Sequence, residues 1–468
     1  MKKCKTFLIF ALLFLTWAAL FRLTGSKTPW QIFTVHDREA GTVVPLGEMA
    51  GRNYDRMGFD GGEILSVKSD GGWLIGTANG ELLHLSKEGK ELWSHSVGSG
   101  LIRSIAVSRD EKTVYAGEKS PDGYLYALDV KTGDVKWKCK GYDIIGGEPD
   151  IRADPQPIHV ATDREGNVYA VFYRFTLDES GTRRYVSRIV SFTAGGDVRW
   201  KYPENGNMDA WVNWGGDAEG AHRFAFGTAN YDKTKIKKLE YNKNIYVLDD
   251  RDGTLVHTET IPTADHFQTV AMRNGPSFSE DGKYLTAMTS DGRGFLYDSN
   301  GNLLWQRTVA EAKNINGTWF FAAGRDAMVV PEGVLFATIN TFGRDNWQMP
   351  SPVIHPASNS LYLFGLDGRF LFRYRAPGEI EGVSTAEGMA ALAVGRNVRN
   401  HDYHAHGAAI VSLSDGKERH YYHTAGPLQA IALSSDGKWA AGIEVPAVTP
   451  EGNLLGDYRL HIWNVEGG

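Results

Sequence analysis

Residues 127–137 read Ala127-Leu128-Asp129-Val130-Lys131-Thr132-Gly133-Asp134-Val135-Lys136-Trp137, and this stretch decides the fold. The residues that lead into it, Tyr124 to Leu128, alternate as in a β-strand, and Asp129 to Gly133 has the composition of a turn. A tryptophan four residues after the turn glycine gives the returning strand a large apolar side chain. The stretch therefore predicts a β-hairpin with an aromatic anchor on its second strand.

The same pattern recurs along the whole chain. Turn glycines in this context are Gly89, Gly133, Gly196, Gly253, Gly301, Gly368, Gly416 and Gly467. A second turn rich in acidic residues and glycine precedes each of them, as in Ser279-Glu280-Asp281-Gly282. Two turns per unit imply four strands, and repeats of roughly 40–50 residues with several strands are typical of propeller blades. We therefore predict an all-β, eight-bladed β-propeller of four-stranded antiparallel blades. A β-sandwich is the alternative, but it does not require a repeated pair of turns in fixed order.

The run from Ala127 to Trp137 resembles the Ala-x-Asp-x-x-Thr-Gly-x-x-x-Trp signature of the pyrroloquinoline-quinone-like (PQQ-like, WD40-like) repeat superfamily. The resemblance covers most of the chain beyond residue 60, with one full signature and several partial copies. The superfamily includes quinoprotein dehydrogenases and a non-catalytic propeller lipoprotein of outer-membrane β-barrel assembly, so the resemblance implies the architecture and leaves the activity open. It also implies that the aromatic residue packs one blade on the next. We expect this role for Trp93, Trp137, Trp200, Trp305 and Phe372.

Residues 1–25 form a targeting or anchoring segment. Three lysines precede an apolar run from Phe7 to Phe21, and Arg22 follows it. A cleaved signal peptide has an apolar stretch of ~7–15 residues, whereas a spanning helix needs ~17–25. We favour one uncleaved hydrophobic helix, a signal anchor, over a signal peptide. In both cases the propeller is extracytoplasmic, periplasmic or at the cell surface, and in the first it is held at the inner (cytoplasmic) membrane.

Residues 26–62 contain one predicted strand, Trp30–His36, followed by a polar connection. The last blade explains that strand, because its own strands fall at Leu428–Leu433, Trp439–Ile443 and Tyr458–Trp463 and a fourth is missing. We predict that the N-terminal strand closes the ring, with Trp30 as the anchor aromatic; an ordinary linker is the alternative. The domains are then the helix at 1–25, the closure strand and connection at 26–62, and the propeller at 63–468.

The predicted loops between second and third strands differ in length from blade to blade. They are short in blades 1 and 5 and long elsewhere, as at Phe172–Val186 and Ile339–Ser360. In an up-and-down blade these loops all emerge on one face, opposite the short turns. Because function on a rigid scaffold concentrates where loops are elaborated, this long-loop face is the predicted docking surface for another protein or peptide.

The densest group of potential metal ligands is His401-Asp402-Tyr403-His404-Ala405-His406. Three imidazoles and the carboxylate of Asp402 could satisfy zinc or copper. No further Cys/His motif accompanies them, so a polar loop without metal is the simpler interpretation. We therefore regard His401, Asp402, His404 and His406 as a candidate metal site.

Two functions remain open: a membrane-tethered interaction scaffold or assembly factor, and a small-ligand or quinone-dependent oxidoreductase with its site at the channel mouth. Polar residues that could line that channel are Asn213, Asp217, Arg273, Asn274, Arg325 and Asp326, although hydrogen bonding among inner strands would also account for them. Quinone chemistry requires PQQ with a divalent cation, and this chain has neither a Cys-Cys pair nor a Cys-x-x-Cys-His haem motif. We favour the scaffold, which needs no cofactor. The net charge of −6 gives no indication of a nucleic-acid partner.

Overall fold

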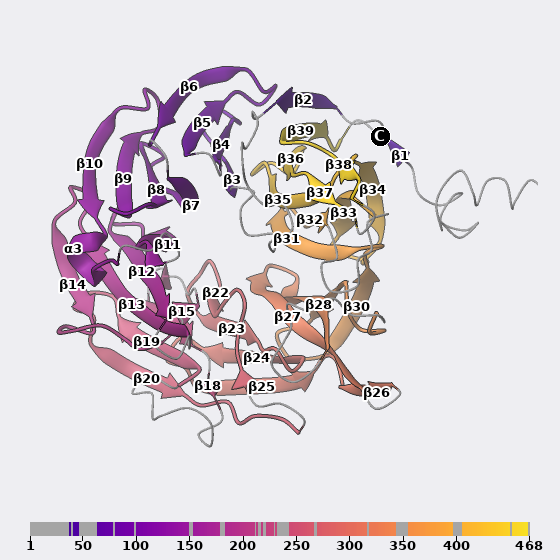
Figure 1. The fold of residues 1–468 in the computed structure, drawn as a ribbon. Coiled ribbons are helices and arrows are strands. Elements are labelled where there is room, and N and C mark those ends of the chain that lie inside the picture. The colour runs from indigo at the N-terminus through magenta and orange to yellow at the C-terminus, as the bar shows by residue number, and fades with distance from the viewer. Residues whose placement is uncertain are drawn as a thin grey trace, which may run out of the picture.

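A computed structural model describes residues 37–38, 41–45, 63–77, 80–97, 100–148, 153–177, 183–210, 212–213, 217–218, 221–228, 230–231, 243–265, 269–315, 318–342, 354–395, 405–449 and 452–466. Within them the chain forms a ring of β-sheets around a central axis, seen face-on in Figure 1. Each sheet runs from an innermost strand near the axis to an outermost strand at the circumference. The predicted all-β, eight-bladed propeller is confirmed.

The first four blades follow one another in chain order. Their strands are β3 (Glu63–Ser66), β4 (Trp73–Gly76), β5 (Glu81–Leu85) and β6 (Glu91–Ser96) in blade 1, and β7 (Leu101–Val107), β8 (Thr113–Lys119), β9 (Tyr124–Asp129) and β10 (Val135–Lys140) in blade 2. Blade 3 contains β11 (Gln156–Thr162), β12 (Val168–Leu177), β13 (Arg183–Phe192) and β14 (Val198–Tyr202). Blade 4 contains β15 (Val212–Asn213), β16 (Asp217–Ala218), β17 (Arg223–Thr228), β19 (Ile245–Asp249) and β20 (Leu255–Glu259).

The remaining blades complete the ring. Blade 5 contains β22 (Ser277–Phe278), β23 (Tyr284–Met288), β24 (Arg293–Asp298) and β25 (Leu303–Thr308), and blade 6 contains β26 (Lys313–Ile315), β27 (Thr318–Val330), β28 (Gly333–Phe342), β29 (Ser360–Phe364) and β30 (Phe370–Arg375). Blade 7 contains β31 (Glu379–Ala386), β32 (Met389–Gly395), β33 (Gly407–Ser412) and β34 (Glu418–His423), and blade 8 contains β35 (Leu428–Leu433), β36 (Trp439–Glu444) and β39 (Arg459–Asn464). Two small antiparallel ladders lie outside the blades, β18 (Asn230–Tyr231) with β21 (Thr269–Val270), and β37 (Ala447–Val448) with β38 (Leu454–Leu455).

The fourth strand of blade 8 comes from the other end of the chain. β2 (Thr42–Pro45) pairs antiparallel with β39, Thr42 opposite Ile462 and Pro45 opposite Arg459. Just before it, β1 (Asp37–Arg38) adds in parallel to the outer edge of β34. The predicted strand Trp30–His36 and the hydrophobic segment 1–25 lie outside the described residues, so the strand found at this edge is a later one.

Three local departures from the sequence-based expectation concern blades 3 and 4. The predicted long loop at Phe172–Val186 is largely strand, because β12 and β13 stay paired out to Leu177 opposite Arg183. The connection between blades 2 and 3 contains a short helix, α3 (Tyr142–Ile145), which was not predicted. The inner strand of blade 4 is interrupted, so that β15 and β16 pair separately with β17.

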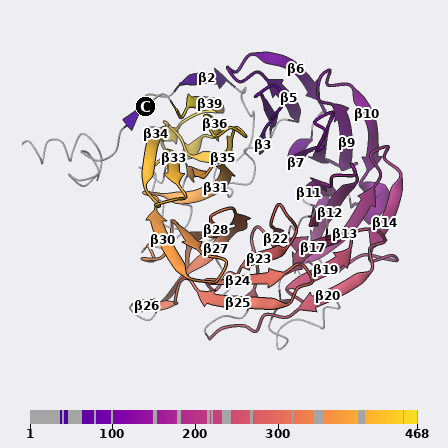
Figure 2. The ribbon, with the colours of Figure 1, turned by 180° about the vertical axis from the view of Figure 1, so that it is seen from behind.

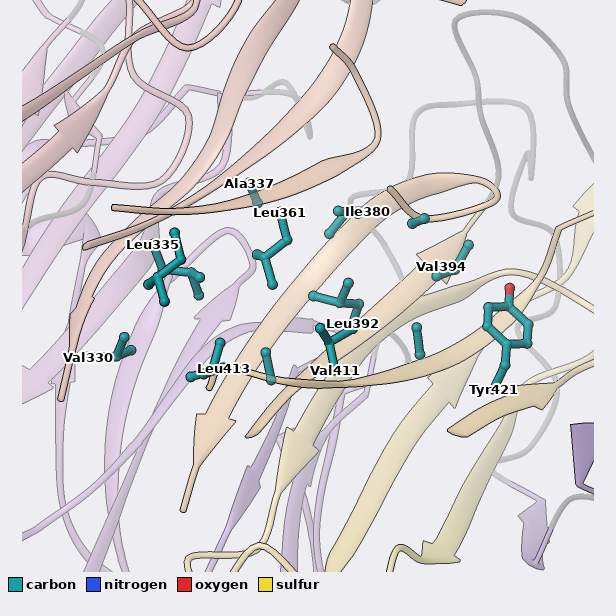
Figure 3. Packing of buried hydrophobic residues seen from close by; sticks show 14 residues of the cluster. Val330, Leu335, Ala337, Leu361, Ile380, Leu392, Val394, Val411, Leu413 and Tyr421 are labelled. Carbon is teal, nitrogen blue, oxygen red and sulfur yellow. The ribbon is translucent and has the colours of Figure 1, made fainter. Parts of the chain in front are cut away.

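The hydrophobic core is divided among the blade interfaces. Each cluster of buried residues joins two neighbouring blades, and Figure 3 shows the one between blades 6 and 7. There Leu335 and Leu361 from blade 6 meet Ile380 and Leu392 from blade 7, all at most 1% exposed. Such sheet-on-sheet packing is what holds successive blades together. In the described part of the chain, no helix is sufficiently long and apolar to span a membrane.

Candidate functional site

The two ends of the blades differ in construction. We call the end with the connections between first and second strands and between third and fourth strands the turn end, and the opposite end the loop end. At the turn end, the aromatic residue of one blade lies against the turn glycine of the next. A Cβ atom built on Gly133, Gly196 or Gly253 would lie 2.8 Å from Cδ2 of Trp93, Trp137 or Trp200, respectively. Only glycine leaves room for such an approach, and its positive φ is also required by the turn.

Hydrogen bonds accompany this packing where the aromatic residue is tryptophan. The indole N–H of Trp93 donates to the carbonyl of Val130 at 2.7 Å, and that of Trp200 donates to Asp250 at 2.7 Å. Trp137 and Trp305 do the same to Ala194 and Leu366, both at 2.9 Å. These contacts place the four tryptophans between blades.

In other blades a residue without an indole occupies the same position between the blades. Phe372 lies against Gly416, whose Cβ would be 2.4 Å from the ring, and His257 lies in the same way against Gly301. Among the described residues Nε2 of His257 has no hydrogen-bond partner, and its nearest carboxylate oxygen, on Glu259, is 3.8 Å away. His257 stands four residues after Gly253, as the tryptophans do after their turn glycines, but it was not among the residues expected to pack between blades.

The candidate metal site can be examined at one residue only. His401, Asp402 and His404 lie outside the described residues. His406 is buried directly before β33, and its Nδ1 is 3.3 Å from the carbonyl oxygen of Ala425. Within the described ranges, no three or more His, Cys, Asp or Glu side chains are grouped so that they could hold a metal ion. The metal site stays a prediction.

Five innermost strands carry a β-bulge, four of them at a charged or polar residue. Register shifts show an extra residue in β7, β11, β27, β31 and β35, and the bulged residues are Arg103, Ile158, Arg325, Glu381 and Gln429. These strands lie nearest the axis (Figure 1). A bulge re-aims a side chain and leaves an unpaired residue, so a periodic hydrophobic pattern does not reveal it.

Four of the six predicted channel residues form one charged cluster across blades 5 to 7. The amide of Asn274 donates to Asp326 at 2.5 Å, and Arg325 donates to the backbone carbonyl of Glu381. Burial and the neighbouring guanidinium of Arg325 lower the pKa of Arg273 to about 10, which leaves it cationic at neutral pH. This arrangement ties neighbouring inner strands together. For the other two predicted residues, Asn213 in β15 and Asp217 in β16, the structure describes the backbone only.

The loop end of blade 3 carries tyrosines on both sides of a projecting hairpin, because strand alternation places Tyr173 and Tyr185 on one face and Arg174, with α3, on the other. The rings of Tyr173 and Tyr185 stack across the β12–β13 hairpin with centroids 6.1 Å apart, and both side chains are partly exposed. Arg174 donates to the carbonyl of Ile145 at 2.9 Å and pairs with Glu148 at 3.1 Å, which fixes α3 against the hairpin. Tyr142 on α3 is 47% exposed. We call Tyr142, Tyr173, Arg174 and Tyr185 the blade 3 patch.

The loop end of blade 6 is organised by a buried histidine. His355 is 1% exposed; its Nδ1 accepts the N–H of Ala357 at 3.1 Å and its Nε2 lies 2.9 Å from the carbonyl oxygen of Glu311. This pattern requires the neutral ring with the proton on Nε2. Burial lowers the pKa of His355 to about 4. The residues before β29 are therefore held by a side chain that stays uncharged in neutral solution.

These features define a class of protein: a β-propeller with aromatic residues between its blades and elaborated connections on one face. The family described as outer membrane protein assembly factor BamB matches residues 32–211 and 227–343, more than half of the chain, and the chain belongs to this family of PQQ-like propellers. No sequence among the curated proteins matches it.

Solved structures share the fold at low sequence identity. The quinohemoprotein alcohol dehydrogenase from Comamonas testosteroni is 14% identical with a TM-score of 0.57, over 88% of this chain and 75% of that one. The quinohemoprotein alcohol dehydrogenase ADHIIG from Pseudomonas putida HK5 is 12% identical with a TM-score of 0.55, over 95% and 83%. The C-terminal WD40 domain of Sif2 is 10% identical with a TM-score of 0.51, over 91% and 99%. At these identities the likeness shows the fold alone.

Proposed function

We propose that this protein is an exported propeller scaffold that docks a partner protein or peptide on its loop end, as an assembly factor would. Membership of the BamB family supports an assembly role. The observation that carries the proposal is the blade 3 patch, in which a paired hairpin carries Tyr173 and Tyr185 on one face, while Arg174 on the other face holds the helix that exposes Tyr142. Tyrosine and arginine are enriched in the energetic centres of protein interfaces, because they combine large contact area with hydrogen-bonding groups.

Photo-cross-linking in cells tests this role. A benzophenone amino acid at Tyr142 should give a discrete cross-linked product, whereas one at Asp281, in a turn-end connection of blade 5, should not. Replacing Tyr185 by Ala should reduce the yield at position 142 several-fold, while Tyr284→Ala, on blade 5, should leave it unchanged. Equal yields at positions 142 and 281, or a product insensitive to Tyr185→Ala, would remove the loop end as the docking surface.

The placement of the scaffold is part of the same proposal. Residues 1–25 act as an uncleaved helix that holds the protein at the outer side of the inner membrane, and the segment that follows closes the ring. The apolar run from Phe7 to Phe21 after three lysines supports the anchor, and the pairing of β2 with β39 supports the closure. Mass spectrometry of the protein extracted from membranes checks this, because a chain that begins near residue 25 would show a cleaved signal.

We further propose that docking requires no quinone or metal. The only cysteines are Cys4 and Cys139, so the vicinal pair of classical quinoprotein alcohol dehydrogenases is missing from the sequence. An ultraviolet–visible spectrum with metal analysis of the purified protein decides between the functions. A quinone absorbance or a stoichiometric divalent metal would instead favour an oxidoreductase.

A further inference from the structure

The outermost strands share a bulge next to the blade-docking position. In seven blades the residue three after the turn glycine is unpaired, and these residues are Leu92, Lys136, Arg199, Val256, Leu304, Leu371 and Arg419. The bulge breaks the alternation of the strand, so that this residue and the one before it both face solvent, and the docking residue then turns inward. Each of these seven blades thus displays a pair of exposed or partly exposed side chains on the circumference of the ring.

In blades 4 to 6 both members of this pair are apolar. The exposed fractions are 49% for Leu255, 42% for Val256, 51% for Leu303, 50% for Leu304, 54% for Phe370 and 40% for Leu371. We call these six residues the apolar rim. The other blades have at least one charged residue in the pair, such as Lys136 in blade 2, and blade 7 has two, Glu418 and Arg419. β20, β25 and β30 follow one another along the circumference in both views (Figures 1 and 2), so the rim covers three adjacent blades.

These three strands are also the open edges of their sheets. Among the described residues no strand pairs with the outer side of β20, β25 or β30. Natural edge strands are commonly protected by charged side chains, and the three pairs of the apolar rim contain none. A row of exposed hydrophobic residues beside an open sheet edge therefore indicates a binding surface.

The chain itself shows what such an edge accepts. β1 adds to β34 at Tyr421 and Tyr422, beyond the bulge at Arg419, so the bulge does not prevent strand addition further along the strand. The equivalent positions are Gln306 and Arg307 in β25 and Arg373 and Tyr374 in β30. The edges of blades 5 and 6 thus have the same backbone arrangement, and at the bulge they carry apolar pairs where blade 7 has Glu418 and Arg419.

We propose that the apolar rim docks an extended, apolar β-strand of a partner protein, which adds to the outer edge of β20, β25 or β30 and covers the exposed pair beside it. Main-chain hydrogen bonds to the edge supply affinity, and the apolar pair selects strands with hydrophobic side chains. The rim lies on the circumference and is separate from the blade 3 patch.

The test uses the full chain in lipid nanodiscs and a fluorescent peptide of alternating valine and threonine. The rim variant combines Val256→Lys, Leu304→Lys and Leu371→Lys, which gives blades 4 to 6 the residue that blade 2 already has at this position, Lys136. The matched control is Val135→Lys, an equally exposed site outside the rim. A second peptide carries proline at its centre and cannot complete the ladder.

We expect the rim variant and the proline peptide each to weaken binding at least about tenfold, with the control variant unchanged. Equal binding of the two peptides would overturn strand addition. Equal binding to empty nanodiscs would assign the peptide to lipid. Rim-dependent self-association in sedimentation velocity, without peptide binding, would assign the surface to a second copy of the chain. Unchanged thermal unfolding of the rim variant shows that its effect is on binding.

Discussion

The turn end and the loop end of the blades are built on different principles. At the turn end one contact is repeated around the ring, an aromatic ring from one blade against a turn glycine of the next, as in Trp200 with Gly253. At the loop end the contacts differ from blade to blade, as shown by the paired tyrosines of blade 3 and the buried His355 of blade 6. The difference teaches that the contacts between blades are encoded in the repeat, whereas the features that distinguish one blade from another are encoded in the departures from it.

The largest expected effect is at the turn end. Replacing Trp200 by Ala removes a side chain that is 6% exposed and leaves the carbonyl of Asp250 without its 2.7 Å hydrogen bond. We expect the free energy of unfolding to fall by about 3–5 kcal/mol, as for other large-to-small changes at buried aromatic residues. His257→Ala, at the same position without an indole, should cost less. Denaturant unfolding measures both, and equal losses would show that the indole is not what distinguishes the interfaces.

At the loop end the expected effect depends on pH. The pKa of His355 is lowered by burial from 6.5 to about 4, so the unfolded chain takes up the proton first as the pH falls. The neutral ring thus contributes stability that is fully present above pH 6.5 and is lost between that pH and about 4. Because one pKa unit is worth about 1.4 kcal/mol, the loss approaches about 3 kcal/mol. The difference in unfolding free energy between the wild type and His355→Gln, measured across that range, should change by this amount; a constant difference would contradict the assignment.

The smallest expected effect separates backbone conformation from close packing. Gly196 and Gly206 both have positive φ, but a Cβ on Gly196 would lie 2.8 Å from Trp137, whereas one on Gly206 would meet nothing within 4 Å. Gly206→Ala should therefore lower the free energy of unfolding only by about 1–2 kcal/mol, because alanine disfavours positive φ. Gly196→Ala should cost a further 1–3 kcal/mol or so from overpacking. If thermal unfolding shifts equally in the two variants, the contact of Trp137 with this turn has little energetic weight.

Local patterns predicted the turn end well. The strands of blade 8 were placed within one or two residues of β35, β36 and β39, because turn glycines and alternating apolar residues are short-range signals. The docking contacts follow from the repeat itself. Neither kind of β-bulge was predicted, since a bulge depends on the register between two strands and not on one strand's composition.

The loop end was harder to predict because it depends on contacts between blades. The β12–β13 extension had a signal, since Phe172 to Leu177 is rich in aromatic and β-forming residues, but its length suggested a loop. The charge cluster of Asn274, Arg325 and Asp326 was anticipated as a set, although its pairing required the fold. The metal candidates at 401–404 remain a sequence-based prediction.

The pairing of β2 with β39 also governs how the protein can be made. The two strands come from nearly opposite ends of the chain, so their ladder has very high contact order. Blades 1 to 7 can gain most of their internal pairings in order during synthesis, whereas this ladder must wait until the last strand has emerged. Until the ladder forms, β2 lacks its partner and the outermost strand of blade 8 has a bare edge, and both are open to association with other chains. The interval between emergence of the chain and this final pairing is therefore the period in which the protein is most exposed to aggregation and proteolysis.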